Sequence, residues 1–391
     1  MNRQFITSFV EQAKLIFGDD LIPLHRPVFE GNERQYLIDC IDSNFVSSVG
    51  AKVTEFEEKV AEFTGSKYAV ATVNGTAALH VAIELAGVKP GDEVISQALT
   101  FIATCNAISY AGAKPLFIDV DVDTLGLSPA ALRRFLDENA QKRASGTFNK
   151  TSGKRISACV PMHTFGFPCR IDEIAEICAN WDIALIEDAA ESLGSYVGSR
   201  HTGTFASMAT LSFNGNKVIT TGGGGMIITN DPELAKRAKY ITTTAKVPHP
   251  YEFVHDEIGY NYRMPNLNAA LGCAQMERLD EFLTVKAQLA DQWGAFFNTR
   301  DAEFFKAIDG SKANHWLNAI ILGSREDRDE FLKMTNDNNI MTRPIWTLMS
   351  KLPMFKDCQT DGLENSLWLE DRVVNIPSSV PDGALKNGIG N

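Results

Sequence analysis

The feature that most constrains the fold is a regular alternation of short apolar runs and helical patterns between residues 60 and 240. Strand-like runs such as Glu93 to Ser96 and Pro115 to Val120 alternate with helical segments such as Phe101 to Tyr110 and Ile171 to Asn180. Strands that alternate with helices of about 10–15 residues are typical of βαβ units, which build a mostly parallel sheet. The sequence therefore predicts an α/β large domain in which helices flank a central, mostly parallel sheet.

The alternation ends near Met264, and a different pattern follows. The spacing of apolar residues predicts one long helix over Asn266 to Ala290 and strands at Trp316 to Ile321 and Ile340 to Pro344. Near the N-terminus, apolar residues recur at helical spacing from Phe5 to Phe17, which predicts an amphipathic helix. The expected parts are an N-terminal segment that packs with the small domain or a partner subunit, a large domain, and a connecting helix with a small α+β C-terminal domain, over residues 1–55, 56–264 and 265–391.

Composition and charge argue against several classes of function. The chain has 391 residues, and its 37 basic and 49 acidic side chains give a formal net charge of −12. This balance argues against binding to nucleic acid or to an anionic membrane surface, because both need a basic face. No apolar run approaches the ~20 residues needed to cross a bilayer. The seven cysteines are scattered and include no C-x-x-C pair, so we expect reduced thiols and a cytoplasmic protein.

A first polar segment, Asn74, Gly75 and Thr76, follows a predicted strand and opens a predicted helix. The free N–H groups and the dipole at a helix N-terminus can bind a phosphate or a carboxylate, and glycine allows the anion a close approach. The alternative interpretation is a plain turn between strand and helix in which Thr76 is the N-cap.

A second segment places acidic residues where a predicted strand ends. The apolar run from Ile183 to Ile186 leads directly into Glu187 and Asp188, and Glu191 follows three residues later. Open α/β sheets bind ligands beyond the carboxyl ends of their strands, and a buried carboxylate needs a partner. A protonated heteroaromatic nitrogen would suit Asp188. The alternative is that Asp188 is the N-cap of a following helix.

A third segment combines a lysine with a run of glycines. Lys217 is flanked by Phe213, Val218 and Ile219, and Gly222 to Gly225 follow it. Because burial lowers the pKa of a lysine, Lys217 is a candidate amine nucleophile; the alternative is a solvated lysine on a loop. Four consecutive glycines indicate a tight turn or a close backbone approach.

A fourth segment, from Gly259 to Met264, is polar and aromatic and could form either an interface or a site loop. The sequence has no H-E-x-x-H, G-x-S-x-G, G-x-G-x-x-G or paired C-x-x-C pattern. Metal-dependent hydrolysis, serine-hydrolase chemistry and nicotinamide binding therefore lack their usual motifs, and we expect no metal site.

Taken in order, the motifs NGTAALH, TFIAT, IEDAAES, SFNGNK and GYNYRM resemble those of the DegT/DnrJ/EryC1/StrS family of nucleotide-sugar aminotransferases. Enzymes of this family have the fold-type I architecture and use pyridoxal 5′-phosphate (PLP), with pyridoxamine 5′-phosphate as an intermediate form. The resemblance extends from Ile22 to Pro377. The variants FVSSVG and TTGGGGM resemble the LegC/PglE-like branch, which aminates C4 of UDP-linked 4-keto-6-deoxy-N-acetylhexosamines for bacillosamine and legionaminic-type surface glycans.

The resemblance implies a role for each matching residue. Lys217 matches the catalytic lysine that forms a Schiff base with PLP, and Asp188 matches the partner of the pyridine nitrogen. Gly75, Thr76 and Ser212 match phosphate ligands, and Asn261 matches a phosphate ligand donated by the neighbouring subunit. Phe101 matches an aromatic that stacks on the cofactor ring, and Glu191 matches a position beside its 3-hydroxyl. Ser47, Ser48 and Arg343 match substrate-facing positions. Because the site is shared, a homodimer is implied.

The implied reaction moves an amino group from L-glutamate to a keto nucleotide sugar. Thr347 to Met349 depart from the Pro-Leu-His of many relatives, which puts the sugar or nucleotide preference in doubt. A GDP- or dTDP-linked sugar or a C3 ketone is therefore an alternative, as is a non-catalytic regulator with this fold. A sugar dehydratase of this family would carry histidine in place of Lys217. His163, after another predicted strand, is assigned no role.

Overall fold

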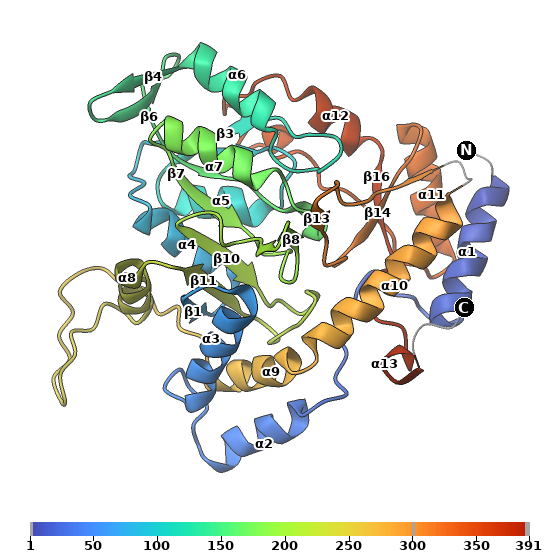
Figure 1. The fold of residues 1–391 in the computed structure, drawn as a ribbon, viewed down its shortest axis with the longest axis horizontal. Coiled ribbons are helices and arrows are strands. Elements are labelled where there is room, and N and C mark those ends of the chain that lie inside the picture. The colour runs from blue at the N-terminus through green and yellow to red at the C-terminus, as the bar shows by residue number, and fades with distance from the viewer. Residues whose placement is uncertain (1–2, 299–301, 388–391) are drawn as a thin grey trace.

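The central sheet lies in the middle of the computed structural model, which describes residues 3–298 and 302–387 (Figure 1). Along the sheet the strands are β1 (Tyr68–Thr72), β11 (Gly225–Thr229), β10 (Met208–Ser212), β7 (Ala184–Asp188), β6 (Arg155–Val160), β2 (Glu93–Gln97) and β3 (Lys114–Ile118). Within this path β11 runs antiparallel to both of its neighbours, and the remaining pairs are parallel. The predicted α/β fold with a mostly parallel sheet is therefore confirmed.

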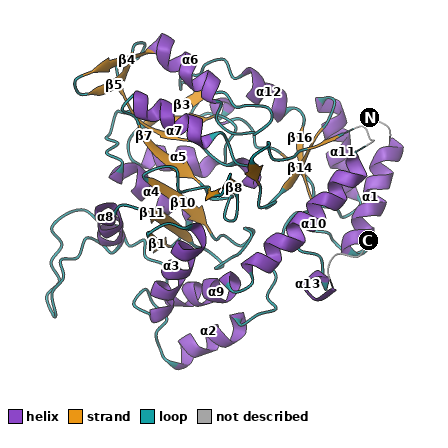
Figure 2. Cartoon of the chain, in the orientation of Figure 1, coloured by secondary structure: helices purple, strands orange, loops and turns teal. Residues whose placement is uncertain are grey.

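Helices cover both faces of this sheet (Figures 1 and 2). The helices of the chain are α1 (Arg3–Phe17), α2 (Glu33–Asp42), α3 (Ala51–Thr64), α4 (Gly75–Leu85), α5 (Ile102–Tyr110), α6 (Pro129–Asn139), α7 (Ile171–Asn180), α8 (Pro232–Thr242), α9 (Asn266–Met276), α10 (Leu279–Phe297), α11 (Arg325–Asp337), α12 (Glu364–Glu370) and α13 (Ala384–Asn387). Because successive strand residues point to opposite faces, Val94 belongs to the core cluster that includes α4, α5 and α8, whereas Ile95 belongs to the one that includes α6 and α7.

Local sequence explains where several of these helices begin. Ser128 accepts a hydrogen bond from the Ala131 N–H and is followed by Pro129, so α6 begins with a capping side chain and a proline at its first position. Asp231 caps α8 in the same way ahead of Pro232. Both helices therefore begin where the sequence supplies a capping side chain and a proline.

The polar stretch at residues 137–155 is a structured hairpin. Its strands, β4 (Ala140–Arg143) and β5 (Gly146–Asn149), pair with each other, and β5 also pairs with β6. The hairpin therefore adds two strands to the central sheet, which has nine in all.

The small C-terminal sheet consists of β12 (Glu303–Phe304), β14 (Asn318–Ile321), β16 (Val373–Ile376) and β15 (Arg343–Pro344). It packs against α1, α10 and α11 through an aromatic cluster in which the Phe9 ring lies 5.2 Å from Trp293 and 4.9 Å from Phe331. The two strands expected here begin later than predicted, at Asn318 and Arg343. We propose to keep the predicted domain boundaries at residues 55 and 264, with α1 as part of the small domain. Residues 1–2, 299–301 and 388–391 of these predicted domains lie outside the described parts.

The single long helix predicted over Asn266 to Ala290 is wrong, because the chain bends between α9 and α10 (Figure 1). The Arg278 N–H donates to the Gln275 carbonyl at 3.2 Å, three residues back, which tightens the turn. The Glu277 carboxylate accepts a 2.6 Å hydrogen bond from the Tyr36 hydroxyl of α2. The bend thus lies where the chain contacts α2.

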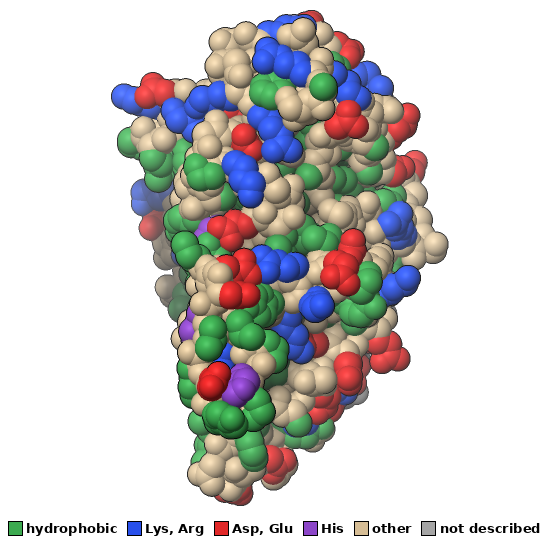
Figure 3. All heavy atoms as spheres, turned by 90° about the vertical axis from the view of Figure 1, so that its left-hand side faces the viewer, with side chains coloured by type: hydrophobic (Ala, Val, Ile, Leu, Met, Phe, Trp, Pro, Cys, Tyr) green, Lys and Arg blue, Asp and Glu red, His purple; other side chains and the backbone are tan. Residues whose placement is uncertain are grey.

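A third, three-stranded sheet joins the large and small parts: β13 (Ser311–Lys312), β8 (Tyr196–Val197) and β9 (Arg200–His201). On another side of the molecule, the chain from 243 to 263 extends away from the body (Figure 1). Basic, acidic and hydrophobic side chains are interspersed over that side (Figure 3). Across the described ranges, no helix combines the length and the apolar character that a bilayer span needs.

Candidate active site

A cavity of about 650 Å³ lies where β7 and β10 end and α4 begins, with one wall formed by the small sheet. Eight of the eleven residues singled out from the sequence line this cavity: Gly75, Thr76, Phe101, Asp188, Glu191, Ser212, Lys217 and Arg343. They come from segments up to 268 positions apart in the sequence, as from Gly75 to Arg343. The carboxyl ends of the strands bring them together, as expected for an open α/β sheet.

The start of α4 forms a candidate anion site beside Ser212. Asn74, not Thr76, is the N-cap, because its side-chain oxygen accepts the Ala77 N–H at 2.8 Å; the interpretation of Thr76 as N-cap is wrong. Gly75 approaches Ser212 so closely that an added Cβ would lie 3.3 Å from its hydroxyl oxygen. The first N–H groups of a helix have no intrahelical acceptor. Since the Ala77 N–H donates to Asn74, the N–H groups of Gly75 and Thr76 are those that could receive a phosphate-sized anion next to the Ser212 hydroxyl.

The glycine run makes the expected close backbone approach. Gly225 lies against the turn before α4, where a Cβ would sit 2.3 Å from the Asn74 carbonyl oxygen. Gly222 has a φ of +80°, a conformation that L-residues rarely adopt. The run therefore allows the chain after Lys217 to turn back and pack directly against the anion site.

Asp188 is the last residue of β7 and is almost fully buried. Its Oδ2 accepts a 2.7 Å hydrogen bond from the Thr104 hydroxyl, and its Oδ1 accepts the Ala190 N–H at 3.2 Å. Burial raises the pKa of this carboxyl group, although both hydrogen bonds and Lys217 act in the opposite direction. No helix follows β7 directly, so the N-cap interpretation is wrong. A cation placed opposite Asp188 would compensate its buried charge.

Lys217 reaches into the cavity from the turn after β10, and its side chain is only 13% exposed. The interpretation as a solvated loop lysine is therefore wrong. Its Nζ lies 3.1 Å from Glu191 Oε1, and Glu191 Oε2 accepts the Phe165 N–H at 2.8 Å. Burial raises the pKa of Glu191 to about 7. The cavity thus contains an amine beside a carboxyl group that titrates near neutral pH.

Aromatic side chains form a further wall. Phe101 directly precedes α5, is 47% exposed, and tilts against Trp346 at 6.1 Å between ring centroids. Trp346 in turn lies 4.9 Å from Phe165. The exposed face of Phe101 offers a flat apolar surface within the cavity.

Arg343 lies at the edge of the small sheet and is exposed. Its guanidinium group donates hydrogen bonds to the Asn336 side chain at 2.8 Å and to the Thr342 carbonyl at 2.7 Å. It is the cavity's basic group besides Lys217.

Three predicted residues lie outside this cavity. Ser47 and Ser48 are in the loop before α3, where the Ser47 carbonyl accepts the Asn266 N–H at 2.9 Å. Asn261 is exposed on the extended chain. Its two neighbours in sequence, Tyr260 and Tyr262, stack their rings on each other. Within one protomer these three residues are not brought to the site.

Below the site, His163 is completely buried beside the end of β7. Its Nε2 lies 3.1 Å from Glu187 Oε2. Burial lowers the pKa of His163, but the contacts with Cys169 and Glu187 outweigh burial and raise it to about 10. The backbone N–H of His163 donates a hydrogen bond to the backbone carbonyl of Asp188 at 3.2 Å. His163 therefore supports the strand end without facing the cavity.

Sequence reasoning missed Thr104, Asn314 and Trp316. Thr104 lies one helical turn after Thr100 within the TFIAT motif, and this spacing is the signal that could have found it. Asn314 donates hydrogen bonds to the carbonyls of Glu191 and Leu193. The indole N–H of Trp316 donates to the Asn216 carbonyl. Nothing in the sequence near Asn314 or Trp316 indicates these hydrogen bonds, because they join segments more than 90 residues apart.

Comparisons with known proteins agree with this geometry. The sequence model of the DegT/DnrJ/EryC1/StrS aminotransferase family matches residues 27–381. The chain is 36% identical over 359 residues to the GDP-perosamine synthase of Escherichia coli O157:H7, covering 91% of this chain and 93% of the relative. It is 28% identical over 362 residues to the dTDP-4-dehydro-2,3,6-trideoxy-D-glucose 4-aminotransferase of Saccharopolyspora spinosa, covering 88% and 89%. The solved structure of the aminotransferase TlmJ from Streptoalloteichus hindustanus superimposes with a TM-score of 0.82 at 25% identity, covering 91% and 93%.

Proposed function

The chain belongs to the DegT/DnrJ/EryC1/StrS aminotransferase family, and from this premise we propose that it moves an amino group from L-glutamate to C4 of a UDP-linked 4-keto-6-deoxy-N-acetylhexosamine. That it is a nucleotide-sugar aminotransferase follows from the family. The amino donor, the nucleotide, the ring position and the LegC/PglE-like branch are parts of the proposal. The observation that carries the aminotransferase chemistry is the Lys217 amine, 3.1 Å from Glu191, in one cavity with Asp188 and the start of α4. The UDP-linked sugar is supported by the sequence resemblance alone.

PLP is the cofactor of this family, and the residues of the cavity fit it. Its phosphate suits the site at Gly75, Thr76 and Ser212, where a Cβ in place of the Gly75 hydrogen would crowd Ser212. Its protonated pyridine nitrogen suits the buried carboxylate of Asp188, and its flat ring suits Phe101. When bound, PLP supplies an aldehyde for imine formation and an electron sink for the electrons of the broken C–H bond.

In the proposed reaction the protein places groups and moves protons. Lys217 would hold the cofactor covalently through Nζ, and as a free amine it would accept the proton from Cα of the amino donor and return it later in the reaction. Asp188 keeps the proton on the ring nitrogen. Glu191 lies beside Nζ and can share its proton. The donor glutamate would give up its amino group and leave as 2-oxoglutarate. The same side chains would then move protons in the reverse order as that amino group passes to the sugar ketone.

A shared site in a homodimer is part of the same proposal. Asn261, Ser47 and Ser48 lie outside the cavity of their own protomer, on exposed segments. The chain around Asn261 also carries large apolar side chains that are more than three-quarters exposed, at Tyr251, Phe253 and Ile258. A second copy would cover these side chains. We include a cytoplasmic location, which the seven free cysteines support.

A second candidate is the same C4 reaction on a GDP- or dTDP-linked sugar. It is favoured by the relatives named for GDP-perosamine and for a dTDP-linked 4-dehydro sugar. The two candidates are separated by incubating the purified protein with L-glutamate and UDP-, GDP- and dTDP-linked 4-keto-6-deoxy sugars, with the products scored by mass and C4 stereochemistry. A C3-keto sugar in the same panel tests the ring position, and a protein that aminates none of them contradicts the proposal.

A further inference from the structure

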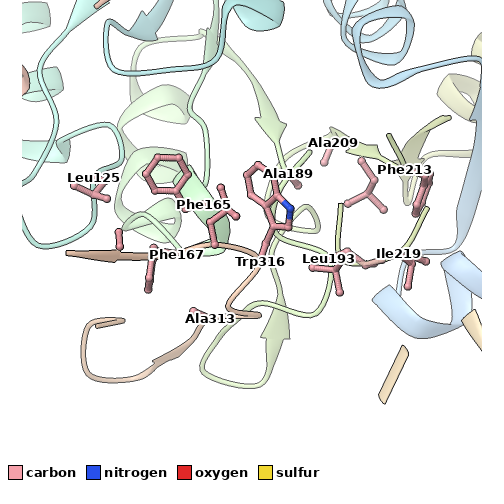
Figure 4. Packing of buried hydrophobic residues seen from close by; sticks show 14 of the residues in the cluster. Leu125, Phe165, Phe167, Ala189, Leu193, Ala209, Phe213, Ile219, Ala313 and Trp316 are labelled. Atoms are coloured by element: carbon pink, nitrogen blue, oxygen red, sulfur yellow. The ribbon is translucent and has the colours of Figure 1, made fainter. Parts of the chain in front are cut away.

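Trp316 contacts the candidate lysine from the small-domain side. It lies in the segment between β13 and β14, is 4% exposed, and lies with Phe165, Ala189 and Leu193 in one buried cluster (Figure 4). Lys217 Nζ lies over the indole ring, 3.8 Å from its centroid. The amine of the cavity is therefore in contact with an aromatic face as well as with Glu191.

Three hydrogen bonds fix the position of this ring. The indole N–H donates to the carbonyl of Asn216, the residue before the lysine, at 2.6 Å. The Trp316 backbone N–H donates to Asn314 Oδ1 at 2.9 Å, and its carbonyl accepts from the buried Lys286 Nζ at 3.2 Å. The ring is therefore connected both to the lysine turn and to the small domain.

The same short segment also fixes the other neighbour of the amine. Asn314 Nδ2 donates to the backbone carbonyls of Glu191 at 2.8 Å and Leu193 at 2.9 Å. Two residues of one segment, Asn314 and Trp316, thus set the positions of the carboxyl group and the ring that flank Lys217 Nζ.

We propose that Trp316 is a positioning residue for Lys217: its ring face restrains the lysine amine and stabilises positive charge on Nζ, and its indole N–H fixes the turn that carries the lysine. This inference rests on the proposed role of Lys217. A lysine side chain loses much rotamer freedom when it is held in one place, and a rigid buried ring limits that freedom in advance. The negative face of an indole attracts a cation within about 6 Å.

The test uses the holoenzyme and its visible absorption band, which changes when the nitrogen of the lysine–cofactor linkage loses its proton. Trp316→Leu removes the ring face, so we expect the pH midpoint of this change to fall by about one unit. We also expect kcat to fall about tenfold while the KM for the amino donor stays within about twofold, because proton transfer depends on the position of the amine. Trp316→Phe keeps a ring face and should restore most of the midpoint.

Trp293→Phe is the matched control. Trp293 is also buried, and its indole N–H also donates to a backbone carbonyl, that of Pro377 at 3.0 Å, but it lies in the aromatic cluster with α1. This variant should change thermal stability and leave the midpoint unchanged. If Trp316→Leu and Trp293→Phe have the same midpoint as the wild type, the proposal is wrong.

A second measurement keeps the test decisive if Trp316→Leu does not fold. A ring-fluorinated tryptophan at position 316 nearly keeps the shape of the side chain and retains the indole N–H donor, while it weakens the negative potential of the ring face. The midpoint should then fall with increasing fluorination, and coincident midpoints would overturn the proposal. A wild-type protein without a visible band after PLP addition would instead contradict the role of Lys217, so the two failures are distinguishable.

Discussion

Lys217 Nζ lies 3.1 Å from Glu191 Oε1 inside the cavity wall. Burial is the largest influence on this carboxyl group and raises its pKa to about 7, while Lys217 and the Phe165 N–H act in the opposite direction. Glu191 is therefore poised between its neutral and charged forms near neutral pH.

The first prediction concerns the pH dependence of stability. Because the folded pKa of Glu191 is raised, the folded chain binds more protons than the unfolded chain between about pH 4.5 and 7, and this group lowers the free energy of unfolding as pH rises. Glu191→Gln should therefore reduce the loss of stability from pH 5 to pH 7, by at most about 3 kcal/mol. Denaturant unfolding of both cofactor-free proteins at the two pH values measures this, and equal losses would contradict it.

The second prediction concerns Lys217→Ala. Without this amine the protein has neither the covalent link to the cofactor nor the proton carrier, so turnover should fall at least about 10³-fold. The visible band of the bound cofactor should change, and borohydride should no longer trap an adduct.

Lys286 is an internal control for that experiment. It is buried, and burial lowers its pKa to about 7, so it could also supply a neutral amine. It does not line the cavity; instead it donates to the carbonyls of Trp316 and Ser378. In the wild type, peptide mapping should place the borohydride adduct on Lys217, and an adduct on Lys286 would refute the assignment.

The third prediction concerns Asp188→Asn. An amide at this position can still accept the Thr104 hydroxyl, but it cannot keep the ring nitrogen of PLP protonated. The variant should retain PLP, and the half-reaction with glutamate should slow by about 10²-fold in stopped-flow absorbance measurements. Thr104→Val, which removes the 2.7 Å hydrogen bond and leaves the carboxyl group in place, should have a smaller effect. Unchanged kinetics in Asp188→Asn would exclude the pyridine-nitrogen role.

The sequence predicts some of these positions for physical reasons. The run from Ile183 to Ile186 is apolar and then becomes acidic, so a buried strand must end with Asp188 at the edge of the sheet, as it does in β7. The glycines after Lys217 indicate a close approach, and Gly225 makes it against Asn74. In both cases the pattern lies within a few consecutive residues.

Other features depend on contacts between distant segments, and the sequence could not predict them. At the bend between α9 and α10, Glu277 contacts Tyr36, more than 200 residues earlier. The ring of Trp316 faces Lys217 because Asn216, Asn314 and Lys286 fix it. Local periodicity does not indicate such contacts, since they join segments that lie far apart in the sequence.

The last prediction tests whether each site takes Asn261 from the neighbouring subunit. The Asn261→Ala variant should lose activity when PLP is limiting. The Lys217→Ala variant should be inactive at every PLP concentration. In mixed dimers of the two variants, one site combines an intact Lys217 with the partner's intact Asn261. Random exchange of subunits should therefore restore about a quarter of wild-type activity. Mixing Lys217→Ala with Asp188→Asn should restore none, because both side chains line the cavity of one protomer. If subunits exchange and neither mixture regains activity, Asn261 does not act across the interface.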